Sequence, residues 1–77
     1  MNDSTQQDWF TISFEDDDQF IKGQKITIHT PQMEKENMLG FLAIQIQKNQ
    51  KILGIRKNGV ELDSKTVAEL IQEVRKI

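Results

Sequence analysis

Four consecutive acidic residues form the densest group of side chains in this sequence that could bind a ligand or take part in a reaction. They are Glu15, Asp16, Asp17 and Asp18. Carboxylate oxygens are the ligands that a hard cation such as Ca²⁺ prefers. A calcium-binding loop, however, alternates its ligands around a central glycine, whereas the apolar pair Phe20 and Ile21 follows here. Because consecutive acids in a loop usually repel one another and stay solvated, we expect a metal-free acidic loop that is open to a basic partner.

Nucleophiles and general bases are scarce in the chain. His29 is the single histidine, and there is no cysteine, so a nitrogen- or sulfur-rich metal site lacks ligands. No serine lies in a G-x-S-x-G setting, and the four glycines are too dispersed for a phosphate-binding loop. We therefore expect His29 to be a surface or half-buried structural residue, in a chain with no catalytic residue, no cofactor, no small-molecule substrate and no enzyme activity.

Positive charge is concentrated in the middle of an acidic chain. The net charge is −2, with −6 in residues 1–21, +5 in residues 22–57 and −1 in the remainder. A cationic sheet that carries aromatic side chains binds single-stranded nucleic acid by phosphate attraction and base stacking. The candidate residues for such binding are Trp9, Lys48, Lys51, Arg56 and Lys57. Lysines at strand ends also prevent edge-to-edge pairing of sheets, and we favour that structural interpretation of these charges.

Alternating apolar residues predict the strands that position these side chains. Phe10, Ile12 and Phe14 alternate with polar residues, which is typical of a strand with one buried face. The same criterion predicts further strands at residues 25–30, 52–57 and 60–62. Asn58-Gly59 should join the last two, because a type I′ hairpin turn needs positive φ at both central positions. We expect Phe20 and Ile21 to anchor the loop between the first two strands.

Residues 31–46 fit both a helix and a strand. Thr30-Pro31 is a suitable helix start, whereas Leu42, Ile44 and Ile46 alternate as in a strand. A helix extending past Gly40 would be apolar nearly all round, which requires more burial than so small a protein easily provides. We therefore predict a strand at residues 41–47, preceded by a short helical turn or a loop.

The C-terminal segment predicts an amphipathic helix. Asp63 or Ser64 is a suitable N-cap. The apolar residues that follow recur at helical spacing and form one stripe. They are Val67, Leu70, Ile71, Val74 and Ile77.

These elements predict an α+β fold. It is a small antiparallel β-meander of about four strands plus a short return strand, with one C-terminal amphipathic helix packed on the sheet. Residues 1–8 are expected to be a flexible polar tail, and residues 9–77 a single domain, because 77 residues leave no room for a second core. The chain has neither a signal-peptide pattern nor roughly 18 consecutive apolar residues, so we expect a cytoplasmic protein that does not associate with membranes.

Residues 55–74, IRKNGVELDSKTVAELIQEV, resemble the last strand and C-terminal helix of a family of transcriptional coactivators. The resemblance implies a dimer that binds single-stranded DNA.

Small domains are commonly stabilised by disulfides, metals or self-association, and without cysteine only self-association remains here. We therefore predict a small non-catalytic protein-interaction or regulatory module that forms a homodimer and binds another protein or itself. The acidic loop would contact a basic partner. The alternative is a single-stranded DNA- or RNA-binding protein that uses the basic segment, residues 22–57.

Overall fold

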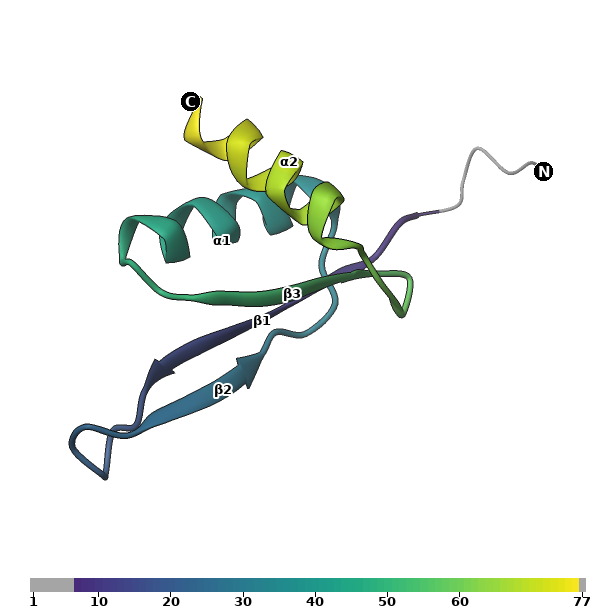
Figure 1. Ribbon diagram of the computed structural model, residues 1–77. Helices are drawn as coiled ribbons and strands as arrows, with labels where there is room; N and C mark the ends of the chain where they lie inside the picture. Colours follow the sequence, from purple (N-terminus) through teal and green to yellow (C-terminus); the bar gives the residue numbers. More distant parts are fainter. Residues whose placement is uncertain (1–6, 77) are drawn as a thin grey trace.

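The computed structural model describes residues 7–76, which form one sheet with two helices on the same side of it (Figure 1). In chain order the elements are β1 (Phe10–Asp17), β2 (Lys25–His29), α1 (Lys35–Gln47), β3 (Ile52–Lys57), β4 (Val60–Glu61) and α2 (Ser64–Arg75). The predicted α+β class, antiparallel sheet and C-terminal helix are confirmed. Residues 1–6 of the predicted tail, and Ile77 of the predicted apolar stripe, lie outside the described residues.

The sheet has the strand order β2-β1-β3-β4, and every neighbouring pair is antiparallel. Two hairpins supply these strands, and α1 connects them. The connection carries the chain from β2 back over the sheet, so β3 pairs with β1 on the side away from β2. The strand order therefore departs from the sequential order of a meander. The first strand lies inside the sheet, and β2 and β4 form its two edges.

The strand predicted at residues 41–47 is wrong, because these residues belong to helix α1. Met38 and Leu42 of this helix are fully buried against the sheet. Phe41 meets Phe14 of β1 edge to face, with ring centroids 5.6 Å apart. Ile44 remains 49% exposed. The prediction assumed that an apolar helix must be buried on all sides, whereas this helix leaves one apolar side in contact with solvent.

The core lies between the sheet and the two helices, as the alternation in the first strand predicts. Its fully or almost fully buried apolar residues are Phe10, Ile12, Phe14, Met38, Leu42, Ile55 and Val74. Thr11 and Ser13 alternate with the core residues of β1 and therefore face the opposite side of the sheet. In α2 only Val74 is buried, and Leu70 of the same stripe is half-buried.

The predicted turn and cap are both present. Asn58 and Gly59 have φ values of 53° and 83°, as the hairpin turn requires. Asp63 precedes α2 and accepts a hydrogen bond from the backbone N–H of Thr66 at 2.8 Å. Hydrogen bonding from the side chain and the backbone of Thr66 lowers the pKa of Asp63 below its ordinary value.

Candidate functional site

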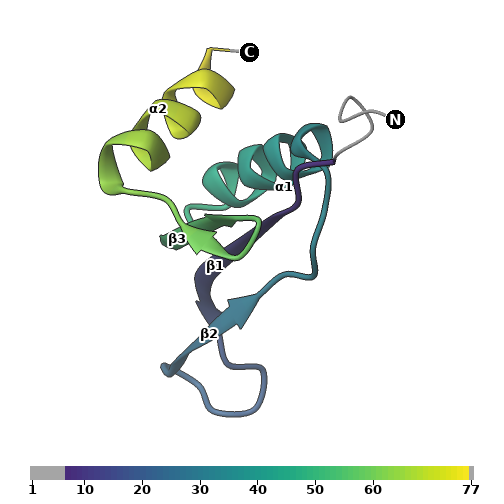
Figure 2. The ribbon, with the colours of Figure 1, turned by 90° about the vertical axis from the view of Figure 1, so that its right-hand side faces the viewer.

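Neither α1 nor α2 covers the opposite face of the sheet (Figure 2). Thr11 pairs with Arg56 across β1 and β3, and Arg56 pairs with Glu61 across β3 and β4. Ser13 lies between His29 and Gly54 in the neighbouring row. Because cross-strand partners project on the same side of a sheet, these side chains share one surface, which we call the open face.

Two adjoining hollows of about 200 and 400 Å³ lie on the open face and share Ser13, His29 and Arg56. The Ser13 hydroxyl is 2.7 Å from Nδ1 of His29, which is the contact of a nucleophile with a base. In residues 7–76 no carboxylate is hydrogen-bonded to this imidazole ring. An activated serine needs its base oriented by a third group. The pair therefore matches the predicted surface histidine better than a catalytic centre.

The four acidic residues do not form a loop, because β1 continues through Asp17. Asp16 accepts a hydrogen bond from the Gln50 amide at 2.8 Å. Asp17 lies 2.6 Å from the Lys25 ammonium, and this hydrogen bond and the charge of Asp17 raise the pKa of Lys25. Each of these carboxylates is held by its own neighbour, and they do not converge on a common point.

Asp18 follows the strand and shapes the turn after it. Its carboxylate accepts the backbone N–H groups of Phe20 at 2.7 Å and Ile21 at 3.2 Å. The prediction that Phe20 and Ile21 anchor the loop is wrong, because Phe20 is 93% exposed and Ile21 is also exposed. The turn is held by the Asp18 carboxylate, which makes apolar anchors unnecessary.

The predicted nucleic-acid-binding residues are not gathered on one surface. Lys48 follows α1 and Lys51 precedes β3, at the opposite end of β3 from Arg56. Arg56 and Lys57 are consecutive strand residues, so their side chains project on opposite faces. Lys57 lies 3.7 Å from the Asp8 carboxylate.

Trp9 is 40% exposed, as expected, and its backbone N–H donates to the Asn58 side chain at 2.9 Å. It lies directly before β1, beside the turn at Asn58 and Gly59. Trp9 is therefore close to Arg56 and Lys57, whereas Lys48 and Lys51 lie at the other end of β3, so the five residues do not form one continuous groove.

Apolar side chains of both β2 and α1 are exposed, including Ile26 and Ile44. Helix α1 packs on β1 and α2 packs on β3, while both helices leave β2 largely uncovered (Figures 1 and 2). As a result Ile26 of β2 is 38% exposed on the helix side of the sheet, and Ile28 is half-buried. On α1, Phe41 contacts Phe14, which is the register partner of Ile28, and Ile44 lies nearly one turn after Phe41 on the same side of the helix. We call these four residues, Ile26, Ile28, Phe41 and Ile44, the apolar flank.

Sequence reasoning missed this flank. The alternation of Ile26 and Ile28 correctly predicted a strand with one apolar face, but it did not show that the strand lies at an edge that the helices do not reach. The alternation around Ile44 predicts a strand, and it therefore does not indicate that Ile44 is exposed on a helix.

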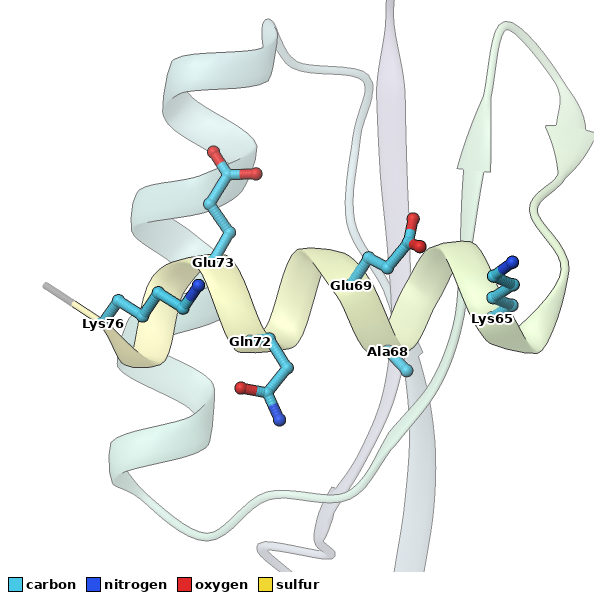
Figure 3. A pocket seen from close by; sticks show the side chains of 6 residues that line it. All are labelled: Lys65, Ala68, Glu69, Gln72, Glu73 and Lys76. Atoms are coloured by element: carbon cyan, nitrogen blue, oxygen red, sulfur yellow. The ribbon is translucent and has the colours of Figure 1, made fainter.

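A depression of about 500 Å³ runs along the outer side of α2 (Figure 3). It is lined by Lys65, Ala68, Glu69, Gln72, Glu73 and Lys76. All six residues come from one helix, and their side chains spread along its surface without converging. This depression does not have the features of a binding site, which normally gathers polar groups from several elements.

Within residues 7–76 no group of three or more His, Asp or Glu side chains is placed to hold a metal ion. Neither helix of the described chain has the length and apolar character needed to cross a membrane.

Comparisons with protein-family models, with curated protein sequences and with solved structures found no match to this chain.

Proposed function

We propose that this protein is a small non-catalytic interaction module that acts as a homodimer. The observation that carries the proposal is the apolar flank, in which Ile26 and Ile44 are exposed beside half-buried Ile28 and Phe41. Contiguous exposed apolar surface commonly marks a protein interface. In a chain that has no cysteine, covering this surface with a second subunit would supply the burial that a small core lacks.

The test is sedimentation equilibrium of the full chain over a wide concentration range. The proposal predicts a reversible dimer. Ile26→Thr should weaken it, because it replaces an apolar side chain of the flank and keeps a β-branched residue in the strand. Leu53→Thr is the matched control, because Leu53 is 41% exposed, as Ile26 nearly is, but lies on β3 outside the flank. A monomer at every concentration, or equal weakening by both variants, contradicts the proposal.

Single-stranded nucleic-acid binding is the alternative, and the +5 charge of residues 22–57 is its motivation. It has less support, because the open face combines Arg56 and Lys25 with the acidic residues Glu15, Asp17 and Glu61. A nucleic-acid surface needs an excess of positive charge. Fluorescence anisotropy with single-stranded DNA and RNA at low salt tests this alternative. Salt-sensitive binding that is lost in the Arg56→Gln, Lys51→Gln double variant would establish it.

A further inference from the structure

We propose that two copies of the chain pair their β2 strands antiparallel, with Thr27 opposite Thr27 of the partner subunit. The two four-stranded sheets would then form one continuous eight-stranded sheet. This inference rests on the proposed homodimer, and it adds the surface that forms the interface and the register of the two strands.

Strand β2 is an edge that lacks the usual protection. It pairs with β1 on one side, and no other described strand pairs with its outer side. Natural edge strands are commonly protected by proline, a bulge or outward-reaching charge. The sequence of β2 is KITIH, and its pairing with β1 has no register shift. The one ammonium group of β2, on Lys25, is held 2.6 Å from Asp17 of the same subunit. The opposite edge, β4, has only two residues and is too short for comparable pairing.

The hydrogen-bond pattern shows which residues of β2 have free backbone groups. Backbone bonds from Asp18 to Gln24 and from Thr30 to Ile12 close the two ends of the β1–β2 ladder at 2.8 and 2.9 Å. In an antiparallel ladder, bonded and non-bonded pairs alternate. Ile26 and Ile28 therefore direct their N–H and C=O groups toward β1. The three residues that direct these groups outward are Lys25, Thr27 and His29.

These outward groups are complementary to a second copy of themselves. With Thr27 opposite the partner's Thr27, Lys25 lies opposite the partner's His29, and His29 opposite the partner's Lys25. Every outward N–H and C=O of both strands then has a partner. If the register of the two strands shifted by one residue, the outward N–H and C=O groups of one strand would face residues of the other whose groups point toward β1. If it shifted by two residues, one of the three outward-directed residues of each strand would have no partner on the other strand.

The same register covers the exposed isoleucines. Ile26 lies opposite the partner's Ile28 in a non-bonded pair, where the Cα atoms approach to about 4.5 Å. Both such pairs project toward the helices, so four isoleucines form a strip between the two α1 helices, and Phe41 and Ile44 of each subunit border it. The apolar flank of each subunit is thus completed by the flank of the other.

The charges at this junction favour a second copy. Lys25 and His29 project on the open face, and Asp17 and Glu15 of the neighbouring strand share that face. The ion pair with Asp17 offsets the charge of Lys25 within its own subunit, and the other side chain that faces Lys25 would be the partner's His29. No carboxylate would be placed opposite another carboxylate.

A strand of five residues is shorter than needed for the roughly 800 Å² per partner of a stable interface. We therefore expect a weak dimer, with a dissociation constant in the micromolar range.

Thr27→Pro is the sharpest variant, because the N–H that it removes does not bond to β1. Proline is tolerated in edge strands when its missing N–H faces outward. We expect the circular dichroism spectrum of the monomer to be retained and the dissociation constant to rise at least tenfold. Ile28→Pro is the matched control, because it removes an inward N–H and should unfold the sheet.

Thr27→Cys tests the register without relying on proline. The chain has no native cysteine, and a bonded antiparallel pair has its Cα atoms about 5.5 Å apart, within the range of disulfides. Under mild oxidation Thr27→Cys should form a disulfide-linked dimer much faster than Leu53→Cys, the exposed control on β3. A dimer in sedimentation whose Thr27→Cys variant links no faster than the control would overturn the β2 pairing and leave the proposed homodimer standing. A monomer at every concentration would overturn both.

Discussion

At the scale of single residues, Gly40 and Gly59 differ in what their backbone demands. Gly59 has a φ of 83°, whereas Gly40 lies inside α1, where a Cβ would meet no atom within 4 Å beyond the neighbouring backbone of its own helix. Gly40→Ala should raise the free energy of unfolding by about 0.5 to 1 kcal/mol, because alanine favours the helix. Gly59→Ala should lower it by about 1 to 2 kcal/mol, because alanine is strained at positive φ. Urea denaturation of both variants measures the two effects. If the free energy of unfolding changed in the same direction in both variants, the proposed difference between the two glycines would be contradicted.

The Asp63 cap makes the stability of the folded chain depend on pH. Because its pKa is lowered in the folded chain, Asp63 contributes stability that is present above its unfolded pKa of about 3.9 and is lost as the pH falls through the folded value. Asp63→Asn keeps a good capping residue and removes this titration. We therefore expect the melting temperature of the variant to fall less steeply than that of the parent below about pH 4. Parallel slopes in thermal melts at several acidic pH values would contradict this expectation.

Features that depend on one or two adjacent residues were predictable from the sequence. The turn at Asn58 and Gly59 and the cap at Asp63 depend on the φ preference or the hydrogen-bonding capacity of the residue itself. The contact between Ser13 and His29 depends on the register of two strands, which local sequence does not specify.

At the scale of elements, α1 presents two very different apolar positions. Leu42 is fully buried, and Ile44 is 49% exposed. Leu42→Ala should lower the free energy of unfolding by about 2 to 5 kcal/mol, since it leaves a cavity beneath the helix. Ile44→Ala should change the stability of the monomer by less than about 0.5 kcal/mol. Chemical denaturation at low protein concentration compares them, and a large loss in Ile44→Ala would show that this side of the helix is buried.

The same helix shows where element prediction failed. Leu42, Ile44 and Ile46 alternate in the sequence, and this alternation matches a strand as well as a helix that has Leu42 and Ile46 on one side and Ile44 on the other. The two are distinguished by what surrounds the segment: Leu42 meets the sheet and Ile46 packs near the core, while Ile44 faces solvent. Those surroundings exist only once the chain has folded. The strands β1 and β2 were easier to predict, because the apolar residues of each strand alternate and all lie on the helix side of the sheet.

At the scale of the whole molecule, stability and association are linked if the protein is a dimer. A partner that binds only the folded chain stabilises it by mass action. The melting temperature should therefore rise with protein concentration over about a hundredfold range. The Thr27→Pro variant should show a melting temperature that does not depend on concentration. Calorimetry at several concentrations measures both, and a parent chain that is insensitive to concentration would contradict association.

The charges of the whole molecule were counted correctly from the sequence, but their distribution in space was not foreseeable. The basic middle segment includes α1 and β3, and the fold sends its cations to opposite ends and opposite faces of β3. The candidate nucleic-acid groove required them on one face. The candidate interface, by contrast, depends on which strand lies at the edge, and that follows from the crossover through α1.

The crossover also sets the order in which the protein becomes foldable during synthesis. The first strand pairs with β3, and Phe10 is the register partner of Lys57. When the first hairpin leaves the ribosome, Phe10, Ile12 and Phe14 have neither α1 nor β3 to cover them. Contacts between residues so distant in the sequence form late, and exposed apolar strands are prone to aggregate meanwhile. A nascent chain of this protein therefore depends on its second half to protect its first strand.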